Sequence, residues 1–281
     1  MQIKPDYDPQ ADGAETWEEF LDWRPGFPAM MSKWFRSLAS LAANTYPKED
    51  DLVGELILAF MSASLSDLND LMILTYRNSH HGGQKILRTL FERIVALKYI
   101  SEHPEDAKRF MDYDAIDWEQ VLMGIHAITG INLEEPARTN LAKAAQKARQ
   151  EYKQEKCPSC KKPKYLGWTS LNSKDMAVRA DLDHMHLHAF LIPSKLIHPT
   201  FWGMRDAVSK SSPMVNTLCC THELIVQMVL IHRRHFAARA ITPLMNAAVR
   251  DFLSIWTYSE TSFGGVLTRG QTRDGGRQIF Y

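Results

Sequence analysis

Residues 84–101 read QKILRTLFERIVALKYIS, and this stretch decides the class of fold. Its apolar side chains recur every three or four residues, which is the spacing of one face of an α-helix. The same spacing returns before and after it, and no long stretch alternates apolar and polar residues as a half-buried strand does. We therefore predict an all-α protein, an irregular multi-helix bundle with a small Cys-x-x-Cys loop and no substantial sheet.

Around this stretch the chain divides into an arm, a helical domain and a tail. Residues 1–26 mix prolines, acids and tryptophans and predict an irregular N-terminal arm. Residues 27–258 carry the helical spacing and predict a single domain. Residues 259–281 hold five glycines and three arginines, so we expect a flexible tail.

Prolines and glycines indicate where helices begin and end. A Gly-Gly pair and its polar neighbours predict a break over 78–83, and Pro193 and Pro243 predict an interruption and a kink. Helices are expected over 28–43, from Pro47 toward Tyr76, over 84–101, from Pro104, near 116–128, and over 134–156, 173–192 and 213–258.

Composition narrows the cellular setting. Of 281 residues, 45% are hydrophobic, which excludes a disordered chain. No apolar run approaches the ~20 residues that span a bilayer, and the acidic N-terminus does not resemble a signal peptide. The four cysteines do not form the framework of a secreted disulfide protein. We expect a cytoplasmic protein.

The net charge is zero, but its distribution is uneven. Residues 1–70 carry 13 acids and five bases, whereas residues 137–167 carry nine bases and two acids. A basic segment of this kind indicates contact with RNA or an acidic partner, or a solvated helix face, or pairing with the acidic part within the fold or across a homodimer. The lysines expected to contact nucleic acid are Lys153, Lys156, Lys161, Lys162 and Lys164.

A cysteine pair and a histidine-rich segment predict a metal site. Cys157 and Cys160 form a Cys-x-x-Cys turn, and His184 and His188 share one helix face four residues apart. Two thiolates and two imidazoles form a closed tetrahedral zinc site, so we predict structural zinc that staples the loop 157–168.

Three alternatives to this zinc site stay open. Cys219, Cys220 and His222 are a competing source of ligands. Asp183, with His184 and His188, has the donors of a catalytic metal site. The loop is otherwise a surface segment with two reduced thiols.

A second set of residues suggests proton and phosphate chemistry. Arg88 and Glu92 lie one helical turn apart among apolar residues, and we expect this pair to be partly buried. Ser194 and His198 are also one turn apart, and His198 precedes a proline that biases it toward a helix end. In one pocket, Arg88 would hold a phosphate, His198 would act as general acid or base, and Glu92 would orient one of them.

The alternative is that Arg88, Glu92, Ser194 and His198 form a polar network that fixes the packing of the helices.

Two further polar clusters have simple structural interpretations. Residues 77–81 are expected to be a polar helix end, and residues 232–235, His-Arg-Arg-His, a solvated stripe of a helix.

These motifs resemble a large bacterial family of unknown function. Its members carry a helix reading L-R-[ST]-L-[FL]-E with an apolar continuation, which here is Leu87 to Glu92 followed by Tyr99 and Ile100. Further on they carry a Trp-and-Ser segment and an S-x-x-x-H-P motif, here Trp168, residues 173–177 and Ser194 to Pro199. The resemblance covers roughly residues 50–205 and implies no activity.

A more distant similarity is to the HEPN helical bundles, many of which cleave RNA as toxins or antiviral effectors. Their R-x(4–6)-H motif is missing here before His198, so Arg88 on another helix would have to supply the arginine.

Together with the basic segment and the Arg and His residues, this similarity predicts an RNA- or nucleotide-handling protein, a metal-independent ribonuclease of toxin or phage-defence type. The alternative is a non-enzymatic, zinc-stapled interaction module in a defence or regulatory complex.

Overall fold

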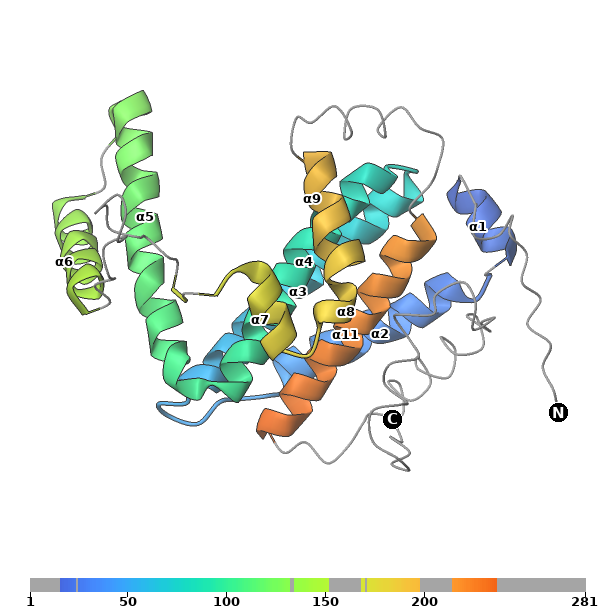
Figure 1. Ribbon diagram of the computed structural model, residues 1–281, viewed down its shortest axis with the longest axis horizontal. Helices are drawn as coiled ribbons and strands as arrows, with labels where there is room; N and C mark the ends of the chain where they lie inside the picture. The colour runs from blue at the N-terminus through green and yellow to red at the C-terminus, as the bar shows by residue number, and fades with distance from the viewer. Residues whose placement is uncertain are drawn as a thin grey trace.

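The computed structural model describes residues 16–23, 25–131, 134–151, 168–169, 171–197 and 214–236. All regular structure within these ranges is helical, which confirms the predicted all-α class (Figure 1). The Cys-x-x-Cys loop lies outside them. The helical elements are α1 (Trp17–Trp23), α2 (Phe27–Ala43), α3 (Leu52–Tyr76), α4 (His80–Glu102), the 3₁₀ turn η1 (Pro104–Asp106), α5 (Ala107–Thr129), α6 (Glu135–Glu151), α7 (Ser173–Arg179), α8 (Asp183–His186), the π-helical segment η2 (Leu187–Leu191), α9 (Ile192–Ile197) and α11 (Met214–Phe236).

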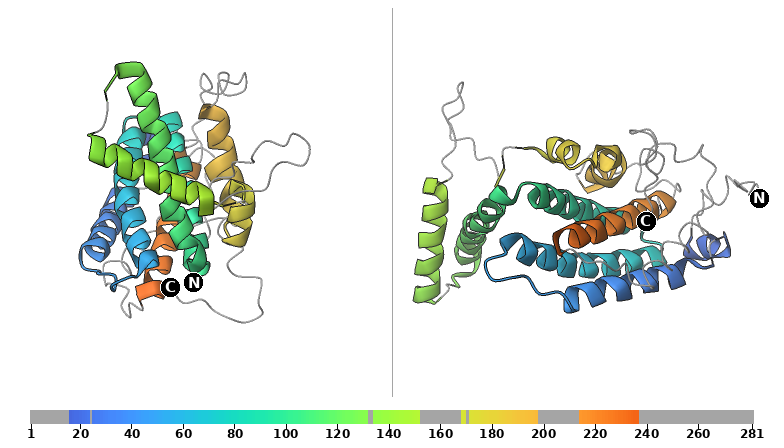
Figure 2. Two further views of the ribbon diagram at one scale, coloured as in Figure 1. Left: turned by 90° about the vertical axis from the view of Figure 1, so that its left-hand side faces the viewer. Right: turned by 90° about the horizontal axis from the view of Figure 1, so that it is seen from below.

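Helix α4 is the centre of the bundle. It contacts α3, α11, α7, η2 and α9. Seven consecutive residues, 94–100, are buried, so this part of α4 is covered on all sides. In Figure 2 the helices α2 and α3 lie on one side of α4, and α7 to α9 lie on the other. The segment that decides the fold class in the sequence is therefore the one around which the other helices pack.

Helix α3 starts later than Pro47, where we expected it. Asp51 caps its N-terminus, because the carboxylate accepts a hydrogen bond from the backbone N–H of Gly54 at 2.9 Å. Gly54 is required there, since a Cβ at this position would lie 2.4 Å from Oδ2 of Asp51. His235 of α11 binds the same carboxylate at 2.8 Å and thereby ties α11 to the start of α3.

The break expected over 78–83 is shorter than the sequence suggests. The turn comprises only Arg77 to Ser79, with Asn78 in the left-handed region at φ 58°, and α4 already begins at His80. Gly82 and Gly83 lie inside the helix. Gly83 is buried, but a Cβ there would make only an ordinary contact with Oγ1 of Thr75 at 3.4 Å. A Cβ at Gly82 would lie 3.3 Å from Cδ1 of Leu74 in α3, so Gly82 is the tighter of the two positions.

The N-terminal arm is partly helical. Trp17 of α1 packs against Phe20 and Phe27, and its backbone N–H donates to Oδ1 of Asn78 at 2.6 Å. Aromatic contacts and this hydrogen bond thus hold α1 against the start of α2 and the turn at Asn78. Residues 1–15 lie outside the described part, as do residues 237–281, which include the expected tail and the kink at Pro243.

Pro193 does not interrupt its helix. α8, η2 and α9 follow one another without a break, and Pro193 is the second residue of α9. Proline cannot donate to the carbonyl four residues earlier. The backbone widens into a π turn immediately before it, so the irregularity lies where a regular α-helical bond would be lost. The hydroxyl of Ser194 donates to the carbonyl of Phe190, four residues before it.

Helices α5 and α6 form a helical hairpin beside the main bundle, and α6 crosses α5 obliquely (Figures 1 and 2). Phe110, near the start of α5, packs against Phe60 and Trp168 and joins the hairpin to the bundle. Farther along, Ile116 packs with Ala145 and Ala148 in a small core separate from the main one. η1 and α5 combine the two helices that we expected from Pro104 and near 116–128.

Among the described helices, α3 is the one whose length and composition would allow it to cross a membrane. In the bundle it packs against α2, α4 and α11. Asp67, within it, pairs with Arg93 of α4. Only 33% of the apolar window of α3 is buried, and one helix of this kind bears only weakly on membrane association.

Candidate functional site

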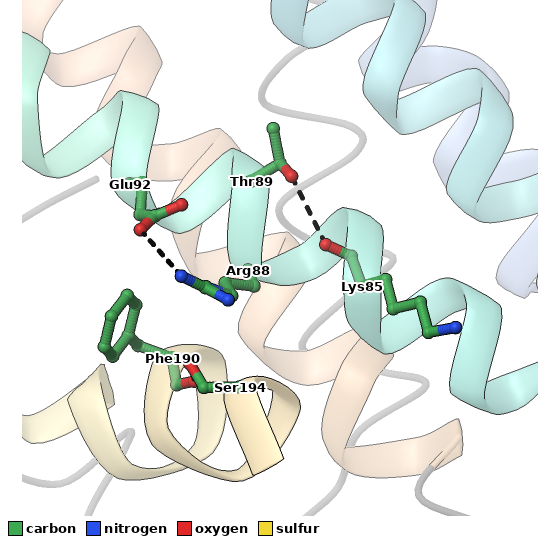
Figure 3. A network of polar contacts seen from close by, with 6 residues as sticks. All are labelled: Lys85, Arg88, Thr89, Glu92, Phe190 and Ser194. Carbon is green, nitrogen blue, oxygen red and sulfur yellow. Dashed lines mark hydrogen bonds and ion pairs between the residues drawn. The ribbon is translucent and has the colours of Figure 1, made fainter. Parts of the chain in front are cut away.

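Arg88 and Glu92 lie on the face of α4 that meets η2 and α9. Nη2 of Arg88 is 3.4 Å from Oε1 of Glu92, so the pair expected from their spacing is formed (Figure 3). The side chain of Arg88 is 22% exposed and that of Glu92 is 45% exposed. The arginine is therefore the partly buried member, while the carboxylate remains in contact with solvent.

The aromatic ring of Phe190 supports the guanidinium from the opposite helix. Cζ of Arg88 lies 4.9 Å from the centroid of this ring. Ser194 lies one turn further along the same helix, below Arg88 in Figure 3, and its hydroxyl donates to the backbone of Phe190 rather than to the arginine. The structure thus gathers Arg88, Glu92 and Ser194 at one helix junction. His198, the fourth predicted residue, lies outside the described residues.

One N–H group at this junction is buried and has no partner. Nε of Arg88 is inaccessible to solvent and makes no hydrogen bond within the part of the chain that the structure describes. A buried donor without an acceptor costs about 1–3 kcal/mol, and more when the group is charged. An oxyanion could reach Arg88 only at the exposed part of this side chain, where a guanidinium can bind phosphate or carboxylate with parallel N–H groups.

His186 is a neighbour that the sequence analysis missed. Its ring stacks on Phe190 at a centroid distance of 4.9 Å and meets Phe91 at 6.2 Å. Burial lowers the pKa of His186, and Lys174 lowers it further, so the ring is neutral at neutral pH. Its Nε2 is buried without a hydrogen bond to the described residues. A neutral imidazole can accept a proton, which makes His186 a second candidate general base.

The signal for His186 was the spacing of His186 and Phe190, one helical turn apart. The sequence analysis instead paired His184 with His188 because both could face one metal ion. Burial lowers the pKa of His188, as expected for an imidazole at a packed surface. In the described residues no three His, Cys, Asp or Glu side chains form a group that could hold a metal ion.

The zinc site therefore stays a prediction. Cys157 and Cys160 lie outside the described residues, so their distance from His184 and His188 is not defined. The residues present suit zinc by donor type, and a structural site would need both cysteines beside this helix.

Cys219, Cys220 and His222, the competing ligands, are buried in α11. Burial raises the pKa of the Cys220 thiol and lowers the pKa of His222 to about 3. The ring of His222 packs edge-on against Trp34 at 5.5 Å. A buried neutral thiol and imidazole of this kind are core residues of the bundle.

The basic segment is described only in part. Arg138 and Arg149 of α6 pair with Glu135 and Glu119, so part of the charge is balanced within the hairpin. The predicted RNA-contacting lysines all lie beyond residue 151, outside the described residues: Lys153, Lys156, Lys161, Lys162 and Lys164.

The two other polar clusters have structural roles. Cζ of Arg77 lies 5.5 Å from the ring of Tyr76, at the turn that docks α1. The prediction that residues 232–235 form a solvated stripe is wrong for His232. This side chain is buried, and its Nε2 lies 2.9 Å from Oγ1 of Thr45. Helix α11 turns this side chain toward the loop before α3, and only Arg234 of the cluster is well exposed.

Fold and site together define an all-α bundle with a half-buried arginine at the junction of its central helix. The chain belongs to a family of unknown function, DUF5677, whose model matches residues 54–214, more than half of the chain. The match confirms the predicted membership of an uncharacterised family and includes α4 to α9. No curated protein and no solved structure matches the chain significantly.

Proposed function

We propose that this protein handles RNA or a nucleotide and that Arg88 binds a phosphate group of this ligand. The observation that carries the proposal is the setting of Arg88. Its guanidinium is held between Phe190 and Glu92, its side chain stays 22% exposed, and its Nε has no hydrogen-bond partner among the described residues. A preorganised guanidinium with unused donors is suited to phosphate recognition.

We further propose that the protein cleaves RNA without a metal ion, as a ribonuclease of toxin or phage-defence type in the cytoplasm. In this reaction the ribose 2′-oxygen attacks phosphorus, and the bond from phosphorus to the 5′-oxygen breaks. A base takes the proton of the 2′-hydroxyl and an acid gives one to the leaving 5′-oxygen. Arg88 would stabilise the charge that develops on the phosphorane oxygens.

Two histidines are candidates for the proton transfers. His198 is the residue that the distant HEPN resemblance favours. His186 has the neutral ring that a base requires. Glu92 would orient Arg88, and Ser194 would shape the helix turn beneath it. The lysines beyond α6 would attract the RNA backbone, and zinc at Cys157, Cys160, His184 and His188 would hold their loop.

The test is cleavage of labelled total RNA by pure protein in EDTA, with circular dichroism to show that the protein stays folded. We expect wild type to cleave and His198→Ala or His186→Ala to be at least about a hundredfold slower, the usual loss for a proton-transfer group. His126→Ala, which removes an exposed histidine of the hairpin, is the matched control. If wild type does not cleave RNA, or if His198→Ala and His186→Ala both cleave as fast as wild type, the proposed ribonuclease activity is rejected.

A protein-interaction module is the second candidate function. The observation that favours it is a row of exposed apolar side chains on α5. Under this alternative, Arg88 only fixes the packing of α4 on α9. Arg88→Ala would then lower the melting temperature, and RNA would be neither bound nor cleaved by the wild type.

A further inference from the structure

Helix α4 carries a lysine inside the bundle. Lys98 lies in the run of buried residues 94–100, and only 8% of this residue is exposed. Its amine forms no hydrogen bond and no ion pair with the described residues. Lysine is almost never buried to this degree unless an opposite charge pairs with it. A buried amine without a partner therefore indicates a role other than packing.

Four charged side chains face the amine of Lys98 from three parts of the fold. Glu102 follows it by one turn of α4, and Asp181 lies in the turn between α7 and α8. Glu223 and Arg234 belong to α11. The three carboxylates outnumber the one guanidinium, so the surroundings of the amine repel an anion and favour an uncharged ligand.

The position of this cluster gives it contact with solvent. Arg234 lies 3.9 Å from Glu102, and their side chains are 70% and 40% exposed. Figure 1 shows the C-terminal ends of α4 and α11 at the same end of the bundle. A small molecule would approach Lys98 from this end. Arg88 is ten residues earlier on α4, about 15 Å along the helix, so the cluster is separate from the proposed phosphate site.

Burial changes the protonation of Lys98. Desolvation is the largest effect on its pKa and lowers it, and Arg234 acts in the same direction. The carboxylates act to raise the pKa but do not cancel the effect of burial. The neutral amine is therefore more abundant at neutral pH than for a lysine in water. A neutral lysine amine has a free electron pair and is a nucleophile.

We propose that Lys98 is a covalent site for a small, uncharged aldehyde. The nitrogen adds to the carbonyl carbon, and the two protons of the amine end on the oxygen, which leaves as water. An imine remains, with a double bond between the nitrogen of Lys98 and the former carbonyl carbon. This imine becomes a cation when it binds a proton, and the carboxylates around Lys98 stabilise such a charge.

The experiment traps the imine in the folded, full-length chain. The protein is incubated at neutral pH with acetaldehyde and cyanoborohydride, which reduces an imine to a stable ethylated amine. Peptide mass spectrometry then gives the rate of labelling at each lysine. The matched control is Lys85, an exposed lysine of the same helix.

We expect Lys98 to be labelled at least about tenfold faster than Lys85, because the neutral amine becomes tenfold more abundant for each unit by which a pKa falls. The rate for Lys98 should also level off at a lower pH. In protein unfolded by urea, both lysines should react at the same rate.

Two results would overturn the proposal. One is a folded chain in which Lys98 is labelled no faster than Lys85 at neutral pH. The other is a pair of rates that rise in parallel with pH, since the amine of Lys98 would then have no special reactivity. Neither result depends on RNA, so the test is independent of the proposed ribonuclease.

Discussion

Arg88 owes its position to two weak contacts rather than to one strong bond. Its cation–π contact with Phe190 is worth about 0.5–1 kcal/mol, and the exposed pair with Glu92 is worth less. Both contacts survive in part when lysine replaces arginine, but the planar fork of N–H groups does not. Under the proposed function, Arg88 therefore has a larger role in recognition than in stability.

We expect Arg88→Lys to lower RNA affinity at least about tenfold while the free energy of unfolding falls by no more than about 1 kcal/mol. Fluorescence anisotropy with a labelled RNA and urea unfolding would measure the two quantities. Arg36→Lys, a change on the exposed face of α2, should alter neither. Equal loss of stability and affinity in Arg88→Lys would instead favour the packing role.

His222 makes the stability of the protein depend on pH. Burial lowers its pKa from 6.5 to about 3 in the folded state. The unfolded chain therefore binds a proton below pH 6.5 that the folded chain does not. The contribution is present above pH 6.5 and is lost as the pH falls toward 3, at up to about 1.4 kcal/mol per pH unit.

In His222→Gln, the slope of the unfolding free energy against pH should fall by the amount that one bound proton contributes. The effect is expected between about pH 6 and pH 4.5, because this window lies between the unfolded and folded pKa values of His222. Urea unfolding at several pH values measures this slope. The exposed His126, changed to glutamine, should leave it unchanged. Burial also lowers the pKa of His186, His188 and His232, so a weaker slope of the same sign should remain in His222→Gln.

Local spacing predicts some of the candidate site but not its partners. The contact of Arg88 with Glu92 follows from their separation by one turn, because neighbours on a helix are fixed by its geometry. Phe190 and His186 reach Arg88 and Phe91 only because α8 and η2 pack on α4. The spacing of apolar residues does not say which helices pack on each other, so Phe190 and His186 could not be assigned to the candidate site before the fold was known.

Among the helices, amphipathic spacing predicted where most of them lie, since burial of one face is what stabilises them. The errors fall at glycines and prolines. Gly82 and Gly83 lie inside α4 despite their low helix propensity, because packing of α4 on α3 and α11 stabilises the helix. Pro193 lies inside a helix because a π turn precedes it, and this adjustment of the backbone leaves no sign in the spacing of apolar residues.

The start of α3 depends on Asp51. Burial acts to raise the pKa of this carboxyl, but hydrogen bonds from His235 and Gly54 outweigh it and lower the pKa. We expect Asp51→Ala to reduce the free energy of unfolding by about 1 kcal/mol or somewhat more, because both the helix cap and the link to α11 are lost. Asp51→Asn keeps an acceptor for Gly54 and should lose less.

Urea unfolding at neutral pH tests the cap, with Glu49→Ala as the control on an exposed neighbour. The order of stability should be Glu49→Ala, then Asp51→Asn, then Asp51→Ala. If Asp51→Ala unfolded at the same urea concentration as Glu49→Ala, the cap would have no role in stability.

Taken as a whole, the described molecule has one large core around α4 and a small one in the α5–α6 hairpin. The class of fold was visible in the sequence, but this division was not, because α5 has apolar residues on two faces and the spacing does not say which face is covered. We expect the two cores to open separately, since few contacts join them.

Hydrogen exchange with mass spectrometry can separate the two cores. Leu90→Ala, at a fully buried position, should lower the stability of the bundle by about 2–5 kcal/mol and accelerate exchange throughout it. Ile116→Ala should accelerate exchange in α5 and α6 alone. Faster exchange in α4 of Ile116→Ala would show that the hairpin and the bundle unfold together.

The most direct measurement for the proposed function is the NMR resonance of the Nε–H group of Arg88 during titration with an uncleavable, 2′-O-methylated RNA. The resonance is assigned by its loss in Arg88→Lys. If the exposed part of the Arg88 guanidinium binds phosphate, the resonance of its Nε–H should shift as RNA binds, and RNA affinity should fall in Arg88→Lys. An Nε–H resonance that stays in place while RNA saturates the protein, or a protein that binds no RNA, would contradict the proposal.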